Sequence, residues 1–329
     1  MKCSVIIPVY NAVNFLSMAV ESAIQQPETG EVILIDDGST DGSLSICQAL
    51  AKQFENVRLL QHSGEKNKGV SASRNLGIKE AFFDYLAFLD ADNYYLTDRF
   101  STAVKIFNEF PDCDGVYDRF VVIFENEDAL DRFKVNREYD PDHIPIINFN
   151  PEDLGTELLT GKFNHLHING LLIKKECISR SGVFNESLRV GEDTDFIIKL
   201  AITSKLFPGN FERPSVVYRF HDHNVFSTPR SKNENSKLRI KLWFSLYDWS
   251  KNNATNSVKD ITLQKVTFFI AQTKVFPFFP ARLFPKKILW IFRFIVFLYL
   301  HPIQIFDKQY TKYILSVLRT GRLSSIDYD

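Results

Sequence analysis

Two acidic residues follow an apolar run of the kind that forms a buried strand. Asp90 and Asp92 end the segment YLAFLDAD, so both side chains can enter one cleft if the chain turns there. Carboxylate oxygens suit Mg²⁺ or Mn²⁺, and Mg²⁺ commonly binds through one or two carboxylates together with substrate phosphates. The pattern predicts a divalent-metal site, although a polar strand end with helix-capping acids would show the same residues.

A second acidic pair, Asp36 and Asp37, ends another apolar run and precedes a helical pattern. Gly38 permits a tight turn, and Asp41 or Ser43 would cap the helix. Turn and cap do not account for two acids at the strand tip, so one of them is a candidate acceptor for a base or ribose. The chain lacks G-x-G-x-x-G after its first strand and G-x-x-x-x-G-K-[ST], which argues against nicotinamide, flavin and P-loop chemistry.

Basic residues gather near the start of a third helical pattern, NKGVSASRNLGI. Lys68 and Arg74 lie there, and Ser71 or Ser73 would cap the helix. The amides of a helix N-terminus favour anions, which predicts a place for a phosphate. An exposed amphipathic helix explains each lysine equally well.

Crowded acids mark the start of the helical segment TDFIIKLA. Glu192, Asp193 and Asp195 follow Gly191, and the helix dipole stabilises such carboxylates as anions. Structural capping requires the same residues, so a catalytic base and a cap both remain open. Farther on, Arg219 and His221 follow a strand-like run and would suit a diphosphate and its metal.

The elements that must position these groups alternate between strand and helix. Continuous apolar runs predict parallel strands buried on both faces, and the segments between them have helical spacing. Such alternation indicates a doubly wound α/β sheet, in which ligands bind outside the carboxyl ends of the strands. The expected strands are 4–9, 31–36, 57–61 and 85–90, and the expected helices are 14–25, 43–54 and 71–81.

The rest of the chain is less regular. Strands are expected at Gly115–Phe124 and Leu171–Lys174, separated by a long polar loop or lid at Glu125–Pro151. After Phe226 the composition becomes aromatic and basic, and helices are expected at 238–249 and 258–274.

Charge is divided unevenly along the 329 residues, although the net charge is only −1. Residues 1–229 hold 22 basic and 34 acidic side chains, whereas residues 230–329 hold 17 basic and 6 acidic ones. The overall balance argues against a dedicated nucleic-acid binder. The basic part contains Ile288–Leu300, an apolar stretch too short to span a bilayer, which predicts either a helix on an anionic membrane surface or a packing or homo-oligomer contact.

Cysteine usage and the N-terminus indicate a cytoplasmic location. The four cysteines form no C-x-x-C pair, and the segment after Met1 lacks the features of a secretory signal. We therefore expect a cytoplasmic protein, peripheral on the inner face of the membrane if the basic part binds lipid.

Taken together, these segments resemble the inverting family 2 glycosyltransferases of the GT-A fold. The resemblance covers about residues 3–227 and depends on SVIIPVYN, VILIDDGSTDGS, NKGVSASRNLGI, YLAFLDADN, GVFNESLRVGEDTDF and YRFHDHN, which follow the family's order. It implies a GT-A catalytic domain at 1–227, with a nucleotide-binding half at 1–95 and an acceptor half at 96–227. A basic, aromatic helical region would follow at 228–329.

The resemblance implies roles on the nucleotide side. Pro8 and Tyr10 would flank the base, and Asp37 would accept a hydrogen bond from the uracil ring, with Asp36 beside it. The family's other nucleotide-contacting positions correspond here to Asn67 and Arg74.

It also implies roles at the reacting centre. Asp90 would approach the ribose, Asp92 would bind the metal, and Asp193 would be the catalytic base with Glu192 as its neighbour. His221 matches a position that reaches the metal or diphosphate, with Arg219 close by. The motif after His221 departs from that of relatives, which leaves the last contacts open.

The resemblance thus implies an inverting hexosyltransferase that uses a nucleotide sugar, expected to be UDP-linked, and Mn²⁺ or Mg²⁺. The acceptor would be a saccharide or a lipid-linked saccharide. We expect the region 125–169 to shape the acceptor site, with His165, His167 and Asn169 as loose candidates for acceptor contacts. Two alternatives are a nucleotide-sugar-binding protein without catalysis and a nucleotidyltransferase. The segment IIPVYNAVNF lacks the glycine-rich basic loop expected of the latter.

Overall fold

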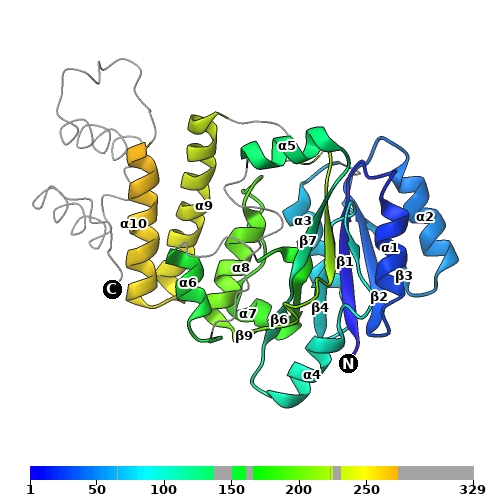
Figure 1. Cartoon of the computed structure of the whole chain (residues 1–329), viewed down its shortest axis with the longest axis horizontal. Coiled ribbons are helices and arrows are strands. Elements are labelled where there is room, and N and C mark those ends of the chain that lie inside the picture. The colour runs from blue at the N-terminus through cyan, green and yellow to red at the C-terminus, as the bar shows by residue number, and fades with distance from the viewer. Residues whose placement is uncertain (65, 137–149, 161–165, 223, 225–230, 273–329) are drawn as a thin grey trace, which may run out of the picture. The chain divides into compact units, whose positions relative to one another are not determined.

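Figure 1 shows the computed structural model, which describes residues 1–64, 66–136, 150–160, 166–222, 224 and 231–272. The chain divides into two units, residues 1–229 and residues 230–329. The apolar segment Ile288–Leu300 and the acceptor candidate His165 lie outside the described residues.

The apolar runs near the N-terminus form parallel strands, as the sequence predicts. They are β1 (Cys3–Val9), β2 (Thr29–Asp36), β3 (Val57–Gln61) and β4 (Tyr85–Phe88). β1 pairs in parallel with both β2 and β4, and β2 pairs with β3. Nearly every residue of β1 and β2 is buried, which explains why their sequences are apolar on both faces.

Three further strands complete this seven-stranded sheet. They are β8 (Leu171–Lys174), β6 (Gly115–Tyr117) and β9 (Leu206–Pro208), and the strand order is β3-β2-β1-β4-β8-β6-β9. β8 runs antiparallel to both of its neighbours, whereas the other pairings are parallel. The predicted mostly parallel α/β sheet is therefore confirmed.

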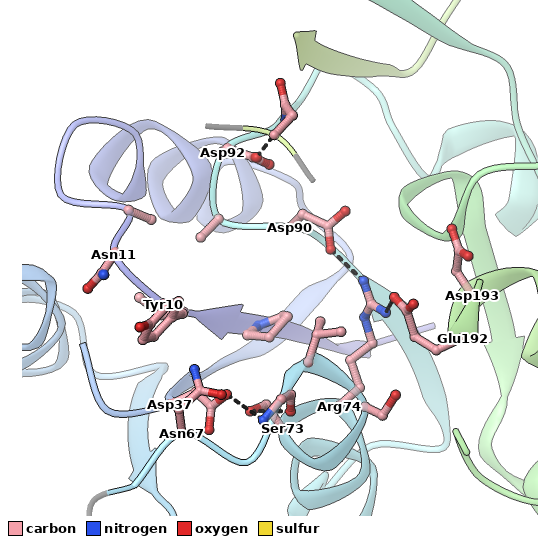
Figure 2. Close-up of a pocket in the computed structure, with 18 of the residues that line it drawn as sticks. Tyr10, Asn11, Asp37, Asn67, Ser73, Arg74, Asp90, Asp92, Glu192 and Asp193 are labelled. Carbon is pink, nitrogen blue, oxygen red and sulfur yellow. Dashed lines mark hydrogen bonds and ion pairs between the residues drawn. The ribbon is translucent and has the colours of Figure 1, made fainter. Parts of the chain in front are cut away.

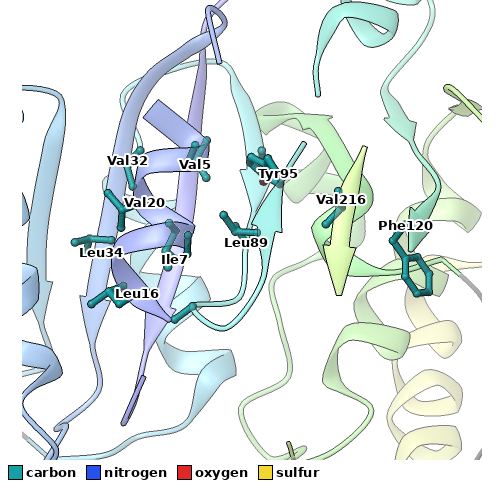
Figure 3. Packing of buried hydrophobic residues seen from close by; sticks show 14 of the residues in the cluster. Val5, Ile7, Leu16, Val20, Val32, Leu34, Leu89, Tyr95, Phe120 and Val216 are labelled. Atoms are coloured by element: carbon teal, nitrogen blue, oxygen red, sulfur yellow. The ribbon is translucent and has the colours of Figure 1, made fainter. Parts of the chain in front are cut away.

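Helices α1 (Leu16–Ile24) and α2 (Ser43–Gln53) cover one face of the parallel strands. Figure 3 shows Leu16 and Val20 of α1 directed toward Ile7 and Leu34 of the sheet. These side chains are fully buried in one hydrophobic cluster that also contains Cys47 of α2. The 3.6-residue spacing of apolar residues in both helices matches this packing.

Helices α3 (Val70–Glu80) and α8 (Glu192–Thr203) carry site residues. They pack against strand side chains such as Ile6 and Phe88. Gly77 of α3 faces Ile6 of β1, so the helix approaches the sheet closely. Phe196 of α8 stacks on Phe184 with ring centroids 4.0 Å apart, and both meet Phe88 of β4 edge-on. This aromatic group packs the start of α8 against the end of β4.

The predicted single strand Gly115–Phe124 is wrong, because the chain changes sheets in its middle. β6 ends at Tyr117, and β7 (Phe120–Phe124) joins a second sheet of order β5-β10-β7, with β5 at Tyr94–Tyr95 and β10 at Val216–Phe220. Between them, the buried Asp118 pairs with the buried Arg99 and accepts a 2.7 Å hydrogen bond from Asn210 N. A buried ion pair at this point cannot continue an apolar strand, so the chain turns.

The predicted loop Glu125–Pro151 begins instead with a helix, α5 (Glu127–Asn136), and residues 137–149 lie outside the described part. The Asn126 side chain accepts a 2.8 Å hydrogen bond from Ala129 N, and Ala129 and Phe133 are fully buried. The helix therefore has a capping side chain and an apolar stripe. The remaining elements of this unit are α4 (Ser101–Glu109), α6 (Leu154–Thr160), α7 (Ile178–Ser181) and short 3₁₀ turns at Ile168–Gly170 and Lys175–Cys177.

The second unit contains α9 (Lys232–Asn253) and α10 (Asn256–Gln272), which confirms the predicted helices there as far as residue 272. A reciprocal capping box between Ser231 and Glu234 starts α9. The Trp243 ring of α9 stacks over Phe269 of α10 at 6.5 Å. Within the described residues, no helix combines the length and apolar character needed to cross a membrane.

The close approach of α3 to the sheet leads to a test of stability. A Cβ on Gly77 would lie 2.5 Å from Ile6 Cγ2 and 3.2 Å from Ile35 Cδ1. We expect Gly77→Ala to reduce the free energy of unfolding, because overpacking costs about 1–3 kcal/mol and outweighs the gain of up to about 1 kcal/mol from alanine in a helix. Urea unfolding of the full chain measures this, with Lys79→Ala at an exposed position of α3 as control. A more stable Gly77→Ala variant would contradict the close packing.

Candidate functional site

A cavity of about 840 Å³ opens at the carboxyl ends of β1, β2 and β4. Its walls include the loops after β1 and β2, the starts of α3 and α8, and the residues after β4 and β10. This size matches clefts that bind nucleotides and similar ligands. The cavity lies where parallel α/β sheets bind ligands.

The loop after β1 is held by side chains of the loop after β2. Asn11 has a left-handed backbone with φ of 51°, and its side-chain oxygen accepts a 2.8 Å hydrogen bond from Thr40 N. Asp41 accepts from Val13 N at 3.0 Å, and Ser43 Oγ accepts from Ala12 N at 2.8 Å. These bonds hold the segment that carries Pro8 and Tyr10, both of which line the cavity.

The two acids of the second strand tip have different surroundings. Asp37 lines the cavity, and its two oxygens accept 2.7 and 2.8 Å hydrogen bonds from Lys68 N and Gly69 N. Asn67, which precedes these amides, is exposed and also lines the cavity. Asp36 is buried and absent from the cavity wall, and neither of its oxygens has a hydrogen-bond partner among the described residues.

Glycines, rather than the expected side chains, occupy the N-cap positions of α2 and α3. Gly42 precedes α2 with φ of 96°, while Asp41 accepts a 3.0 Å hydrogen bond from Ser43 N. Gly69 precedes α3 with φ of 97°, so neither Ser71 nor Ser73 caps that helix. Positive φ angles at both positions favour glycine.

Arg74 joins the acid after β4 to the first acid of α8. Figure 2 shows its guanidinium between Asp90 and Glu192. The distances are 2.7 Å to Asp90 Oδ1 and 3.1 Å to Glu192 Oε1, and the arginine is 3% exposed. Burial alone would lower the pKa of Arg74, but Asp90, Glu192 and Asp193 outweigh it and raise the pKa. Arg74 is therefore permanently charged.

The same contact acts differently on its two carboxylates. Burial favours a higher pKa for Asp90, but Arg74, the charge of His167 and hydrogen bonds outweigh it, and the pKa is lowered. For Glu192, burial and then the neighbouring charge of Asp193 raise the pKa to about 7 despite Arg74. Near neutral pH, Asp90 is ionised and Glu192 is divided between its two forms.

Asp193 is the less enclosed acid at the start of α8. It is half-buried and lines the cavity, and its Oδ1 accepts a 2.7 Å hydrogen bond from Thr194 N. The predicted position of these acids in the first turn of a helix is confirmed by α8, which begins at Glu192.

Asp92 lies beside two residues that follow β10. Its Oδ2 is 3.2 Å from both His221 Nε2 and Asn224 Nδ2. Its Oδ1 is buried and has no hydrogen-bond partner among the described residues. His221 is itself buried, with its ring 4.7 Å from the Phe15 ring.

This arrangement fits a divalent cation. Asp92 Oδ1 offers an oxygen that nothing in the described structure uses, and His221 offers an adjacent imidazole. The described residues contain no group of three or more His, Cys, Asp or Glu ligands, so the remaining ligands would come from a substrate and water. Mg²⁺ commonly binds with few protein carboxylates and substrate phosphates, and Mn²⁺ also prefers oxygen ligands.

The loose acceptor candidates His167 and Asn169 both lie near Asp90. His167 lines the cavity, and its ring is 5.0 Å from the Tyr218 ring. Asn169 is fully buried, and its Oδ1 accepts a 3.1 Å hydrogen bond from Asp90 N. Asn169 therefore supports the backbone at Asp90 and does not line the cavity.

Arg219 does not reach the cavity wall. Its backbone N–H donates to Asn93 Oδ1 at 2.8 Å, and its guanidinium lies over the rings of Phe15 and Tyr94 at 4.8 and 5.5 Å. One of its nitrogens is 3.1 Å from Met18 Sδ. Strand alternation from Tyr218, which lines the cavity, directs the next side chain away from it.

Two residues near the site were not anticipated from the sequence. Arg189 lines the cavity, and its guanidinium lies so near Gly69 that a Cβ there would be 3.1 Å from it. His62 follows the carboxyl end of β3 and lies 3.6 Å from Asp37 Oδ1. The strand-end rule that selected Asp37 and Asp90 also selects His62, when applied to the third strand.

Comparison with known proteins identifies the family. The family model described as glycosyl transferase family 2 matches residues 4–168. The Bacillus subtilis minor teichoic acid biosynthesis proteins GgaB and GgaA are 28% identical over 76% of this chain and 26% identical over 62% of it. The chain spans only 26% and 44% of those two proteins. The Escherichia coli glycosyltransferase YibD, whose function is uncharacterised, is 46% identical over 28% of the chain, which spans 26% of YibD.

Solved structures of Staphylococcus aureus TarS have the same fold. Residues 1–349 of TarS in complex with UDP-GlcNAc superpose with a TM-score of 0.60 at 18% identity, covering 82% of this chain and 72% of that one. The complex with UDP has a TM-score of 0.55 at 17% identity and covers 82% and 71%. The predicted GT-A fold, followed by helices in the C-terminal part of the chain, is confirmed.

The raised pKa of Glu192 leads to a test of pH dependence. Its pKa of about 7 exceeds the usual 4.5, so the folded state holds the proton more tightly than the unfolded chain. The resulting stability is complete below the unfolded-state pKa and is lost as the pH rises through about 7. Between about pH 5 and about pH 8, we expect wild type to lose on the order of 1–3 kcal/mol more unfolding free energy than Glu192→Gln.

Urea unfolding at the two pH values gives this difference. Glu176→Gln, at an exposed position of the same unit, should keep the wild-type pH dependence. Parallel pH profiles for wild type and Glu192→Gln would mean that Glu192 does not hold its proton near neutrality.

Proposed function

Because the chain belongs to glycosyl transferase family 2, we propose that it transfers a sugar from a UDP-linked donor to a hydroxyl of a saccharide or lipid-linked saccharide, with inversion at the anomeric carbon and with Mn²⁺ or Mg²⁺. The observation that carries the proposal is one cavity lined by Asp37, Asp92 and Asp193. These three acids come from separate strand ends and a helix start. A fold alone would not require them to meet.

The donor end of the cavity is suited to a uridine nucleotide. Tyr10 is exposed at the cavity wall, where its ring can contact a base, and Asp37 offers an acceptor for the base N–H. The matched TarS structures hold UDP and UDP-GlcNAc, which supports UDP as the carrier.

Electrostatics supports metal assistance. The described lining includes seven Asp or Glu residues but only three Lys or Arg residues, namely Lys68, Arg74 and Arg189. A diphosphate entering this acidic cavity would be repelled, and Arg74 is already paired with two carboxylates. A divalent cation at Asp92 and His221 would offset the repulsion and stabilise the charge that develops on the departing nucleoside diphosphate.

Asp193 is our candidate for the base. It lines the cavity, and its Oδ1 accepts hydrogen bonds from Thr194 N at 2.7 Å and from Thr194 Oγ1 at 3.3 Å, so that Oδ2 can accept from an acceptor hydroxyl. Glu192 is less suited, because Arg74 binds it and burial favours its neutral form. Asp193 would remove the hydroxyl proton as the oxygen attacks the anomeric carbon. A single displacement inverts that carbon and needs no covalent sugar–enzyme intermediate.

The acceptor and the location are proposed from the named relatives and from the charge of the C-terminal part. GgaB and GgaA are named for minor teichoic acid biosynthesis, which supports a growing glycan or its lipid-linked precursor as acceptor. An anionic membrane surface suits the basic residues 230–329, and the same residues would suit a homo-oligomer contact. A cytoplasmic enzyme peripheral to the inner membrane face remains our proposal.

A donor panel tests the proposed function. With Mn²⁺ present, UDP-GlcNAc and other UDP-sugars should yield UDP, by transfer to added saccharide or by slow hydrolysis, whereas an inactive binding protein would yield none. Excess chelator should abolish UDP release, and added Mn²⁺ or Mg²⁺ should restore it. Asp92→Asn should weaken both UDP binding and turnover, because it removes a charge that would face the metal.

Two results would contradict these assignments. Full activity in excess chelator would refute the metal site at Asp92. Release of pyrophosphate instead of UDP would indicate a nucleotidyltransferase.

Replacement of the base tests Asp193. Asp193→Asn retains the shape but removes the proton acceptor, so turnover should fall about a hundredfold or more with little change in donor affinity. Steady-state kinetics and calorimetric UDP binding separate the two effects. Glu186→Gln, which changes an exposed acid of the same cavity wall, should have a much smaller effect on turnover. If Asp193→Asn lost donor binding but kept normal turnover, Asp193 would be a structural acid.

A further inference from the structure

His62 is a buried polar residue that the proposed reaction does not use. It follows β3, the edge strand of the seven-stranded sheet, whose one neighbour β2 leads to Asp37 at the same end. The side chain is 8% exposed and is not part of the cavity wall. A buried imidazole requires polar partners, and its partners here lead to the nucleotide site.

Four residues form a closed set of contacts, which we name the Asp37 cluster: Asp37, His62, Gly69 and Ser73. Asp37 Oδ2 accepts from Gly69 N at 2.8 Å, and Gly69 O accepts from Ser73 Oγ at 3.4 Å. Ser73 Oγ is 3.1 Å from His62 Nε2, which in turn is 3.6 Å from Asp37 Oδ1. Figure 2 shows Asp37 and Ser73 on the same side of the pocket.

One tautomer of His62, with its hydrogen on Nε2, fits the contacts of the Asp37 cluster. Ser73 Oγ donates its hydrogen to Gly69 O, so it can only accept from His62. With Ser73 donating to Gly69 O, the tautomer of His62 that carries its hydrogen on Nε2 satisfies both contacts and places positive polarity beside Asp37 Oδ1. Asp37 is held from one side by the amides of Lys68 and Gly69 and from the other by His62.

The remaining acceptor capacity of Asp37 faces the cavity. An ionised carboxylate has about four lone-pair positions on its two oxygens. Lys68 N uses one on Oδ1, Gly69 N uses one on Oδ2, and His62 lies against Oδ1. Because Asp37 lines the cavity, an unused position on Oδ2 can receive one donor from a ligand.

We propose that His62, acting with Ser73, is a positioning residue that fixes the Asp37 carboxylate for recognition of the ring N–H of uracil. The inference rests on the proposed function, in which a uridine nucleotide is the donor. Uracil presents a hydrogen on N3, whereas cytosine presents a lone pair at the same atom. Acceptor oxygens fixed at Asp37 therefore attract uracil and repel cytosine, and His62 contributes to base selection without touching the base.

The experiment compares UDP and CDP binding by calorimetry with Mn²⁺, using the full chain. His62→Gln places a donor nitrogen near the position of Nε2, whereas His62→Leu fills similar space without a donor. We expect His62→Leu to lower UDP affinity about tenfold while CDP affinity stays the same, because a hydrogen bond to a charged group is weakened. The UDP-to-CDP affinity ratio should fall about tenfold, and His62→Gln should keep the wild-type ratio.

Two further variants complete the design. His62→Asn remains polar but is too short to reach Ser73, so its UDP and CDP affinities should match those of His62→Leu. It replaces His62→Leu in the comparison with wild type if the leucine variant does not fold. Gln61→Leu changes an exposed neighbour at the end of β3 and should leave both affinities unchanged. Thermal unfolding of each variant reports any general loss of structure.

The outcomes separate this inference from the proposed function. Equal losses of UDP and CDP affinity in His62→Leu and His62→Asn would show that His62 only fills space, and would overturn its positioning role. An unchanged ratio in both variants would overturn it as well. If wild type itself binds CDP as tightly as UDP, the uridine assignment fails, and the role of His62 fails with it.

Discussion

The site depends on the paired contact of the Arg74 guanidinium with two carboxylates. Its guanidinium is buried between Asp90, which follows β4, and Glu192, which begins α8. Lys68 and Arg189, the other Lys or Arg residues in the described cavity wall, are exposed. Without Arg74, acids from two distant parts of the chain would face each other at a few ångströms in a poorly solvated place. Packing of α8 against β4 therefore requires this arginine as well as the phenylalanines behind it.

The elements that the sequence predicts well are those determined by local pattern. Continuous apolar runs predicted β1 to β4, because strands buried on both faces consist mainly of apolar residues. Helical spacing predicted α1, α2 and α3, because a helix buried on one face has apolar residues at that spacing. The strand-end rule then brought Tyr10, Asp37 and Asp90 to one cavity. Six motifs in family order led to the same family as the comparisons.

The features that the sequence did not predict depend on contacts between distant residues. In the sequence, Asp118 is a polar residue within an apolar run. Its buried ion pair with Arg99 explains why the chain changes sheets there. Asp36 and Asp37 are adjacent acids of the same type, yet only Asp37 reaches the cavity wall. Arg219 has the right charge for a diphosphate, but strand alternation directs its side chain toward Phe15. Alternation along a strand predicts that neighbouring side chains point to opposite faces, but the sequence alone does not show which of the two faces the cavity.

The span of the Arg74 contacts has a consequence for biosynthesis. Asp37 binds the amide of Gly69, 32 residues later, and Arg74 binds Glu192, 118 residues later. A chain still emerging from the ribosome can form β1 to β4 and α3 early, but it has no partner for one side of Arg74 until residue 192 has left the exit tunnel. The part of the cavity around Asp37 can therefore assemble first, and the part around Glu192 is completed only when most of the first unit has been synthesised.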